Sequence, residues 1–527
     1  HFTPLSEDET LRLLKRAKPT TAAVDPIPTK LVLEFIDILL PVIQNIVNVS
    51  LQSGKVPGAF KKAAVKPLLK KASLDPNELG NFRPVSNLAY MSKILERAVA
   101  EQLQSHLNAH SLQVKFQSAY RSGHSTETAL LRILNDLLSM IDSGNNALLV
   151  LLDLSSAFDT IDHELLLRRL HTDIHLGGFV LEWFTSYLSG RTQEVHIRQS
   201  RSDSTVLKYG VPQGSVLGPL LFSLYTRDLA QLIRSFCIEY HFFADDTELY
   251  SCLPLDQESA LRAVDNVQNC CNDIKQWMTA NKLKLNEQKT EVLVCGPPAR
   301  RALVPVSSLS VGDASIPFAS VVKTLGVFFD ADLCLEQHVS HIVRTCFFYI
   351  RSLGKIRPYI TKKAAASVAV SLVLSRIDYC NSLLVGLPQT QIKRIQSAQN
   401  AAARTVTKGR KGDHITPVLR ELHWLPVQQR CEHKLLTLVQ KCVNGEAPSY
   451  LSELVETYTP SRSLRSASRT LLRVPGPRDI KTKRYGQRAF RYNGPKLYNE
   501  LPDSVKLKDS EISTFKSKLK THLFHPV

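Results

Sequence analysis

The sequence predicts an α+β protein in which an antiparallel sheet is backed by helices and is followed by a mostly helical, basic C-terminal region. Short apolar runs of strand length, such as 147–152, alternate with longer segments that repeat apolar residues at helical spacing. Beyond residue 340 this alternation stops, and segments rich in Ala, Leu, Arg and Lys follow. The chain has 527 residues, enough for several domains with cores of their own.

Residue spacing predicts where the individual helices and strands lie. Apolar residues at helical spacing predict helices over 35–51, 88–107, 130–141, 165–170, 219–233 and 260–279. Apolar or alternating runs predict strands at 64–71, 147–152, 290–294 and 323–329, a hairpin around residue 245, and a weaker strand at 471–474. Prolines and an aspartate predict a loop over 20–28. A domain boundary is expected at 335–345, and a looser one at 458–469.

Positive charge is concentrated in the C-terminal third of the chain. The formal net charge is +18, yet residues 341–527 hold 33 Lys and Arg against 12 Asp and Glu, so the rest of the chain is close to neutral. A segregated basic region is typical of a protein that binds a polyanion such as nucleic acid. A surface that only improves solubility is the alternative, but such surfaces rarely segregate by region.

The ten cysteines form no Cys-x-x-Cys pair and no spacing typical of zinc sites, which predicts reduced, mostly buried thiols in an intracellular protein. The apolar run 364–374 is too short to cross a bilayer, and no secretory signal opens the chain. The sequence begins at His1 rather than at methionine, so we expect a fragment that lacks upstream domains.

Two adjacent aspartates, Asp245 and Asp246, interrupt the apolar stretch 242–250, and the strand-like flanks place them at a hairpin tip. A third aspartate, Asp153, ends the apolar run 147–152. Carboxylates beside apolar strands are costly unless a cation compensates them, and hard oxygen ligands suit magnesium. Two such ions are the usual machinery of phosphoryl transfer, so the pattern indicates a nucleic-acid polymerase. A capped turn, in which Asp is common, is the structural alternative.

Five blocks then occur in the order that is found in reverse transcriptases. They are Asn81–Asn87, Phe116–Thr126, Asp153–Asp159, Gly210–Pro219 and Phe243–Asp246. Each block alone is weak, but five in order are very improbable by chance. The chain resembles the polymerase of non-LTR (LINE-type) retrotransposons, strongly over 60–335 and more weakly towards both ends. The resemblance implies a right-hand polymerase that copies RNA into DNA.

For the metal site, the resemblance implies that Asp153 and Asp245 bridge two magnesium ions, with manganese as a substitute. The Leu154 carbonyl would complete one coordination shell. Asp246 would support the site and contact metal less directly. Asp159 is expected to cap the following helix instead of binding metal.

For the incoming dNTP, the resemblance implies contacts from fingers and palm. Phe158 would lie under the sugar and exclude a 2′-hydroxyl, Gln213 would contact the nucleotide, and Gly214 would let the backbone approach closely. Alternatives remain for each of them: a core phenylalanine at 158, and a plain serine-capped helix N-terminus at 213–215.

Three basic residues complete the expected site. Lys289 matches a family lysine near the pyrophosphate, with a solvated lysine as the alternative. Arg121 and Arg83 would grip the triphosphate, and arginines in structural ion pairs are the competing interpretation. The segment 323–330 resembles the primer-grip strand, where Gly326 would permit close contact with the primer.

The expected domains are an N-terminal helical extension (1–60), reverse transcriptase fingers and palm (61–335), a helical thumb (336–400) and a basic nucleic-acid-binding region (401–527). Fingers would come from 60–147 and 165–205, and palm from 148–164 and 206–335. The segments 375–383 and 422–427 are familiar from the C-terminal region of such elements. The segment 492–502 departs from them, with Asn-Gly before its first proline and Tyr498 where relatives have Trp, which hints at an ageing copy.

The resemblance also implies the partners: an RNA template, a DNA primer at nicked target DNA, and dNTP, with no membrane. A ribonucleoprotein in nucleus and cytoplasm is expected, and the oligomeric state is left open. The endonuclease of such elements has no room in 1–60, and no acidic cluster after 340 indicates an RNase H. Two other interpretations stay open: an RNA-dependent RNA polymerase, which Phe158 and Ala244 disfavour, and a decayed or co-opted copy that binds RNA only.

Overall fold

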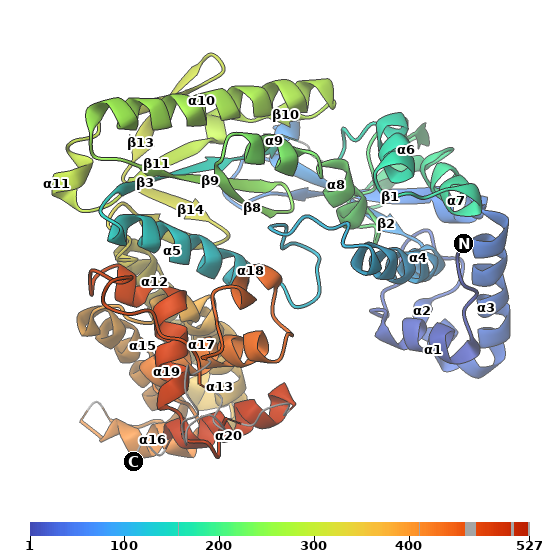
Figure 1. Cartoon of the computed structure of the whole chain (residues 1–527). Helices are drawn as coiled ribbons and strands as arrows, with labels where there is room; N and C mark the ends of the chain where they lie inside the picture. Colours follow the sequence, from blue (N-terminus) through green and yellow to red (C-terminus); the bar gives the residue numbers. More distant parts are fainter. Residues whose placement is uncertain (156–157, 411, 459–470, 507–510, 525–527) are drawn as a thin grey trace. The chain divides into compact units, whose positions relative to one another are not determined.

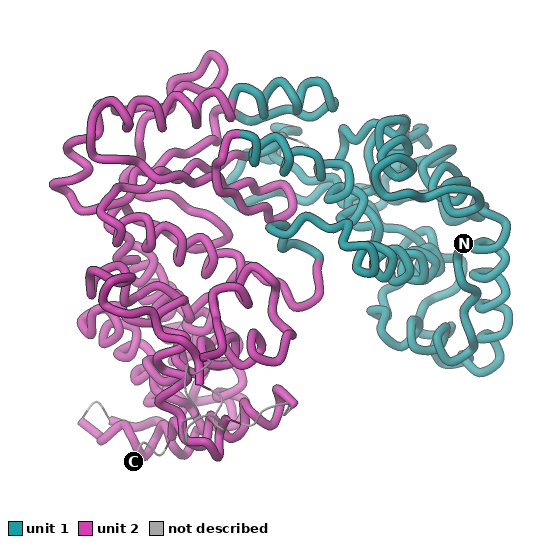
Figure 2. Tube along the Cα trace, viewed as in Figure 1, with its two compact units in different colours: residues 1–120, 153–235, 272–286 teal, residues 121–152, 236–271, 287–527 magenta. Residues whose placement is uncertain are grey.

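The computed structural model describes residues 1–155, 158–410, 412–458, 471–506 and 511–524, so Ser156, Ala157 and the looser boundary expected at 458–469 lie wholly or mostly outside it. Packing divides the chain into two units (Figure 2). Unit 1 comprises residues 1–120, 153–235 and 272–286, and unit 2 comprises 121–152, 236–271 and 287–527. The expected domain boundaries, which follow the order of the chain, remain predictions.

Unit 1 is built on a mixed sheet whose strand order is β2-β1-β5-β6, with β7 beside β5. The strand β1 (Lys62–Leu69) pairs antiparallel with β2 (Phe82–Leu88) and parallel with β5 (Thr192–Ile197). The short strands are β6 (Ser200–Arg201), β7 (Thr205–Val206) and the separate pair β4 (Leu154–Ser155) and β10 (Lys284–Leu285).

The helices of unit 1 bury their apolar faces around this sheet and around one another. They are α1 (Glu7–Arg16), α2 (Thr29–Glu34), α3 (Ile36–Ser53), α4 (Tyr90–Ala109), α6 (His163–Thr172), α7 (Gly178–Leu188), α8 (Gly218–Tyr225) and α9 (Leu229–Ser235), with the 3-10 turns η1 (Gly58–Lys61) and η2 (Leu79–Asn81). A capping box at Ser6 and Glu9 starts α1. Trp183 is fully buried, and its indole N–H donates to Ser50 Oγ at 3.1 Å, which ties α7 to α3.

Unit 2 contains a six-stranded sheet of order β12-β13-β11-β3-β9-β8, which is antiparallel except between β11 and β13. Its strands are β3 (Asn146–Leu152), β8 (Glu239–Phe243), β9 (Asp246–Leu253), β11 (Glu291–Cys295), β12 (Ser308–Val311) and β13 (Ala314–Ala319). In Figure 1, α5 (Thr126–Asp142) lies on one side of this sheet and α10 (Gln257–Ala280) on the other. The central strand β3 is therefore almost wholly buried, which explains its continuous apolar sequence.

The rest of unit 2 is a hairpin followed by helices. The hairpin consists of β14 (Val321–Thr324) and β15 (Val327–Asp330). The main helices are α12 (Glu336–Ile356), α13 (Lys362–Ala369), α15 (Gln389–Thr407), α16 (Ile415–Glu421), α17 (Val427–Val443), α19 (Phe490–Glu500) and α20 (Ile512–Phe524). Shorter pieces are η3 (Glu287–Lys289), α11 (Pro298–Arg301), η4 (Arg357–Tyr359), the π-helical turn η5 (Val370–Leu374), α14 (Ser375–Asp378), η6 (Asn381–Leu384), α18 (Ser449–Ser452) and η8 (Gly486–Arg488).

Most predicted elements are confirmed to within a few residues, and three predictions are wrong. The helix expected over 219–233 is two helices, α8 and α9, because the chain turns at 226–228, where Arg227 donates to the Leu112 carbonyl. The strand expected over 323–329 is the β14–β15 hairpin. At 471–474 only an isolated bridge, Thr457 to Leu472, is formed among the described residues.

The cysteines and the lengths of the helices bear on two further features of the chain. All ten cysteines are free thiols and most are buried, as predicted. Among the residues that the structure describes, none of the helices combines the length and the apolar character that a bilayer crossing requires.

The buried His241 of β8 predicts a dependence of stability on pH. Burial, together with the positive charge of Arg132, lowers its pKa from 6.5 to about 3. Below pH 6.5 the imidazole of His241 becomes protonated in the unfolded chain but stays neutral in the folded chain. The free energy of unfolding is therefore highest above pH 6.5 and decreases as the pH falls towards 3. We expect the free energy of unfolding to drop by up to about 1.4 kcal/mol per pH unit in this window relative to His241→Gln. Chemical denaturation of both proteins between pH 3 and 6.5 measures this free energy. Parallel pH profiles of the two proteins would show that His241 does not cause the dependence.

Candidate functional site

Four strand ends meet at one edge of the sheet in unit 2. Neighbouring strands run antiparallel here, so the end of β3 lies beside the start of β9 and the start of β11. The register places Leu152 opposite Thr247 and Leu151 opposite Glu291. The chain continues from Leu152 directly into Asp153, which is the first residue of the next segment of unit 1.

The turn between β8 and β9 carries the predicted acidic pair at this edge. Phe243 pairs with Asp246, so only Ala244 and Asp245 form the connection. Ala244 has a φ of 61°, in the left-handed region that suits a tight hairpin but is unfavourable for a residue with a Cβ. Asp245 is half-buried and Asp246 is exposed. The predicted hairpin tip is confirmed, and its backbone is held in a strained conformation.

A buried carboxylic acid lies behind the acidic turn, and the sequence analysis missed it. Glu248 of β9 is 1% exposed, and its Oε1 accepts a hydrogen bond of 2.6 Å from Thr324 Oγ1 on β14. Its Oε2 has no hydrogen-bond partner among the described residues. Burial, and to a lesser degree the charge of Asp246, raises the pKa of Glu248 to about 8. The strand β9 (Asp246–Leu253) also carries Asp246, Thr247 and Ser251, so no local sequence pattern marked Glu248 as buried.

The β14–β15 hairpin, which was expected as the primer-grip strand, turns at Leu325 and Gly326, with φ values of 45° and 82°. The Tyr379 hydroxyl donates to the Leu325 carbonyl at 2.6 Å. A Cβ on residue 326 would lie 3.2 Å from the Tyr379 ring, so both the backbone conformation and the contact favour glycine.

Two of the predicted basic residues also lie in unit 2. Lys289 is exposed on η3, two residues before β11, and therefore belongs to the same edge as the acidic turn. Arg121 is half-buried, and burial lowers its pKa while Tyr450 partly offsets the effect. Tyr450 belongs to the C-terminal region, and its hydroxyl donates to Thr128 Oγ1 at 2.9 Å.

In unit 1, Asp153 is held by the segment that follows β10. The Asn286 backbone N–H donates to the Asp153 carbonyl at 2.9 Å, and the Asn286 side chain approaches Asp153 Oδ2 at 3.4 Å. The next residue, Leu154, is buried and pairs with Leu285. The backbone that carries the first predicted ligand is therefore fixed by strand pairing on its C-terminal side.

Phe158 is half-buried and packs on Phe222 of α8, with 5.0 Å between the ring centroids. Its carbonyl accepts from the Val211 N–H at 2.9 Å. Gly210 is required at this crossing, since its φ is +79° and a Cβ there would lie 2.7 Å from the Asp159 carbonyl oxygen. The Phe158 segment and the glycine-rich segment are thus joined directly.

The glycine-rich loop 210–218 is also attached to β2. The Gln213 carbonyl accepts from the Ser86 N–H at 2.7 Å, and a Cβ on Gly214, whose φ is +118°, would lie 2.6 Å from the Ser86 oxygen. Gln213 donates to Asp159 Oδ2 at 2.9 Å, and burial raises the pKa of that carboxyl group. The expectation that Asp159 caps the following helix is wrong, because the Asp162 side chain caps α6. Arg83 is exposed on β2, opposite Leu68 of β1.

A second buried acid, Glu96 of α4, supports this loop from below, and the sequence analysis missed it too. Its Oε2 accepts from the backbone N–H groups of Val216 and Leu217 at 2.7 and 3.1 Å. Burial raises the pKa of Glu96, and the nearby positive charge of Arg191 acts against that shift. Arg191 is itself 1% exposed and lies over the Tyr187 ring at 4.8 Å. A carboxylate thus holds the N-terminal end of α8 in place.

The predicted site residues are distributed over both units. Unit 1 brings together Phe158, Gln213 and Gly214, with Asp153, Leu154 and Arg83 elsewhere in the same unit; unit 2 holds Asp245, Asp246, Lys289 and Arg121. Within the described ranges, no cluster of three or more His, Cys, Asp and Glu side chains is arranged to hold a metal ion.

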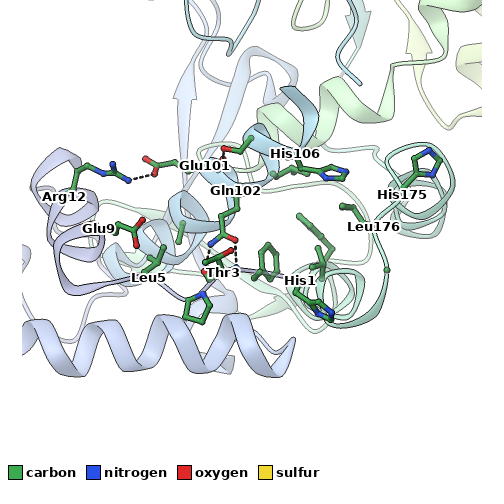
Figure 3. A pocket seen from close by; sticks show the side chains of 18 residues that line it. His1, Thr3, Leu5, Glu9, Arg12, Glu101, Gln102, His106, His175 and Leu176 are labelled. Carbon is green, nitrogen blue, oxygen red and sulfur yellow. Dashed lines mark hydrogen bonds and ion pairs between the residues drawn. The ribbon is translucent and has the colours of Figure 1, made fainter. Parts of the chain in front are cut away.

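A cavity of about 560 Å³ in unit 1 is a separate feature (Figure 3). Its lining contains none of the predicted site residues. The Arg12–Glu101 ion pair of 3.2 Å and the two hydrogen bonds between Gln102 and the backbone of Thr3 close its walls. These contacts attach the N-terminal segment to α4. The cavity therefore lies where the N-terminal segment packs against the rest of unit 1.

Comparison with known proteins decides the family. Residues 69–329 match the family model described as "Reverse transcriptase (RNA-dependent DNA polymerase)". The chain is 28% identical over 357 residues to "Probable RNA-directed DNA polymerase from transposon X-element" and 26% identical over 302 residues to "RNA-directed DNA polymerase from mobile element jockey", both of Drosophila melanogaster. The chain contains a reverse transcriptase domain and is similar to the polymerases of LINE-type retrotransposons. The resemblance inferred from the five sequence blocks is confirmed.

These alignments cover 66% and 56% of the chain but only 38% and 32% of the two relatives. The chain therefore spans about a third to two-fifths of the length of these curated relatives. Among solved structures, apo telomerase from Candida tropicalis is similar with a TM-score of 0.41 and 12% identity, over 71% of this chain and 63% of that one.

The contact between Glu96 and the loop of the reverse transcriptase domain yields a prediction. Glu96→Ala leaves two buried N–H groups without an acceptor, so we expect a loss of about 1–3 kcal/mol in the free energy of unfolding. Glu96→Gln keeps an acceptor oxygen and should lose less. Hydrogen exchange followed by mass spectrometry should show faster exchange at 210–218 in Glu96→Ala than in Glu96→Gln, and equal protection in both variants would argue against the contact.

Proposed function

We propose that this reverse transcriptase domain is an RNA-directed DNA polymerase that transfers a nucleotidyl group from dNTP to a primer 3′-hydroxyl. The observation that carries the proposal is the strand register at the edge of the unit 2 sheet. Leu152 and Thr247 are paired, so Asp153 follows on one strand where Asp246 and Asp245 precede on the other. A carboxylate that leaves the sheet at the end of β3 and one on the adjoining turn are suited to sharing divalent cations.

The donor set fits magnesium. Asp153 and Asp245 would hold two ions, the Leu154 carbonyl would add a ligand, and Asp246 would support the site; all of these are hard oxygen donors. Magnesium usually takes one or two carboxylates and completes its shell with water and substrate phosphates, so a site without a ready-made cage of protein ligands is expected. Bound magnesium, or manganese in its place, would activate the primer hydroxyl and neutralise charge on the triphosphate.

The remaining predicted residues would bind and orient the dNTP. Phe158 is fixed between the glycine-rich loop and Phe222, where a rigid ring would exclude a ribose 2′-hydroxyl. Gln213 and Gly214 would contact the nucleotide from a loop whose backbone is already anchored, which reduces the entropy lost on binding.

Three basic residues would contact the phosphates of the dNTP. Lys289 lies at the same sheet edge as the acidic turn and would neutralise, or protonate, the leaving pyrophosphate. Arg83 and Arg121 would grip the triphosphate from the fingers, where arginine forks suit phosphate oxygens.

The wider assignment follows from the same relatives. We propose target-primed reverse transcription, with an RNA template, a primer in target DNA, and a ribonucleoprotein that acts in nucleus and cytoplasm. Palm and fingers would come from 61–335, a helical thumb from 336–400, and a basic nucleic-acid-binding region from 401–527. The basic excess after residue 340 supports the last of these.

The first test removes one metal ligand. Asp245→Asn keeps the size of the side chain but removes its charge, and a metal clamp supplies several kcal/mol of transition-state stabilisation, so we expect dNTP incorporation on an RNA template to fall by about a thousandfold or more. Asp313→Asn, a turn residue between β12 and β13, is a matched control that should retain activity. Wild-type protein that is folded but forms no product with dNTPs or rNTPs, in magnesium or manganese, would refute the polymerase assignment and favour a decayed copy.

The second test concerns the sugar. Phe158→Ala removes the ring that is proposed to exclude the 2′-hydroxyl, so the ratio of kcat/KM for dNTP to that for rNTP should fall by about tenfold or more, equivalent to at least ~1.4 kcal/mol. Phe158→Tyr retains the ring and should preserve the ratio. Wild-type preference for rNTPs would instead identify an RNA polymerase, and an unchanged ratio in Phe158→Ala would assign the residue to the core.

A further inference from the structure

A basic pocket in the C-terminal helices of unit 2 lies outside every site described so far. Its volume is about 550 Å³, within the ~300–1,000 Å³ typical of sites for single small ligands. It is lined by Ser125, Glu127, Asp378, Asn381, His423, Leu425, Arg430, His433, Lys434, Thr437, Leu438, Lys441, Lys516 and Lys520. The lining draws on the segments 116–126, 375–383 and 422–427, which were singled out in the sequence, and the last two have no part in the proposed catalytic site.

The two helices that form much of this wall present basic stripes to it. On α17 the lining residues Arg430, Lys434 and Lys441 recur at intervals of four and seven, which places them on one face. On α20, Lys516 and Lys520 are four residues apart and exposed. The helices α17 and α20 pack against each other, so both stripes border the same space.

The acids in the lining already have partners. Arg430 donates to both carboxylate oxygens of Asp378, and Lys434 lies 3.4 Å from Glu127. The Glu127 carboxylate also accepts from the Ser382 N–H at 3.0 Å, so it belongs to the scaffold.

Three further cations of the lining have no such partner. Lys441, Lys516 and Lys520 form no ion pair with any residue that the structure describes. The ammonium groups of these lysines therefore give the pocket a net positive charge. Burial, together with the charges of Lys516 and Lys520, lowers the pKa of His433, which agrees with that positive field.

One neutral polar group in the pocket is also incomplete. Asn381 is 1% exposed, and its Nδ2 donates to Asp378 Oδ1 at 3.3 Å. Its Oδ1 is buried and has no hydrogen-bond partner in the described part of the chain. A buried carbonyl oxygen without a donor is costly, and a ligand hydroxyl could supply that donor.

We propose that this pocket binds the sugar–phosphate backbone of single-stranded RNA. Lys441, Lys516 and Lys520 contact phosphates, and Asn381 Oδ1 accepts a hydrogen bond from a ribose 2′-hydroxyl. DNA lacks that hydroxyl, so the asparagine distinguishes the two polymers where the lysines cannot. This inference rests on the proposed function only for the choice of RNA as the bound polymer. It places one RNA contact outside the proposed polymerase site.

The lysines are tested by RNA binding without dNTP or divalent metal. Fluorescence anisotropy of a labelled RNA oligonucleotide over a KCl series should show that Lys516→Ala/Lys520→Ala binds about tenfold more weakly at low salt, with a slope of log affinity against log salt reduced by about 1.4, or ~0.7 per lost phosphate contact. The matched control is Lys363→Ala/Lys393→Ala, which removes the same charge from exposed positions on α13 and α15. If the control pair loses as much affinity as the pocket pair, the pocket is not the site.

The asparagine contact is tested on the wild-type protein, so folding of a variant does not enter. RNA should bind several-fold more tightly than the DNA oligonucleotide of the same sequence, and 2′-O-methyl RNA, which cannot donate, should bind as DNA does. In Asn381→Ala the preference for RNA should disappear while DNA affinity stays the same. Equal binding of RNA and 2′-O-methyl RNA by the wild type would overturn the contact.

Failure of the polymerase assignment would be visible separately. Asp245→Asn should bind RNA as tightly as the wild type, whether or not the wild type extends a primer. If the wild type extends a primer, Lys516→Ala/Lys520→Ala should keep kcat at saturating annealed template and raise only the template concentration that is needed. A loss of kcat in that variant would place these lysines in the catalytic machinery and would contradict a separate RNA site.

Discussion

The pairing of β3 with β9 and β11 is the constraint on which the candidate site depends. A polar side chain on a strand that is covered on both faces is costly unless it is hydrogen-bonded, and β3 is almost wholly buried. The seven residues of β3 include no ionisable group, and Asp153 follows where the strand ends. Because its neighbours are antiparallel, the acidic turn of β8–β9 and the start of β11 come to that same edge. The apolar sequence of β3 thus decides where carboxylates can gather.

Buried acids stabilise the irregular backbone in both units. In unit 1, Glu96 accepts hydrogen bonds from the N–H groups of Val216 and Leu217, which immediately precede α8. In unit 2, Glu248 joins β9 to β14 through Thr324. Burial raises the pKa of both acids, that of Glu248 to about 8, because burial disfavours the charged form. Glu96 thereby restrains the loop that carries Gln213 and Gly214, and Glu248 fixes β14 beside the strand that follows the acidic turn.

The elements that the sequence predicted correctly are those with local signals. Helical periodicity located α10, a continuous apolar run located β3, and two aspartates between strand-like flanks located the β8–β9 turn. The failures depend on contacts that are distant in the sequence. The break between α8 and α9 is stabilised by Arg227 reaching Leu112, and the β14–β15 turn by Tyr379.

The two missed acids have the same explanation. Whether a glutamate is solvated or buried under a loop depends on which segments cover it, and Glu96 is covered by a loop 120 residues further along the chain. The family could be identified from the sequence because five motifs of the right residue types occur in the expected order. The roles assigned to Lys289, Arg83 and Arg121 rest on resemblance alone, since no local pattern distinguishes a phosphate ligand from a solvated cation.

Affinity and selectivity for nucleic acid require different kinds of side chain. In the proposed RNA pocket of unit 2, exposed lysines would supply affinity and a buried asparagine would supply selectivity. Exposed lysines such as Lys516 and Lys520 attract any polyanion, because phosphates are common to RNA and DNA and the attraction falls with salt. Discrimination requires a group that is fixed, desolvated and incomplete without the correct partner. Asn381 has these properties, because Asp378 holds its amide nitrogen while its oxygen is left buried. Asp378 is in turn fixed by Arg430, so a charged pair that adds nothing to the net attraction orients a neutral group that can accept a hydrogen bond from the sugar.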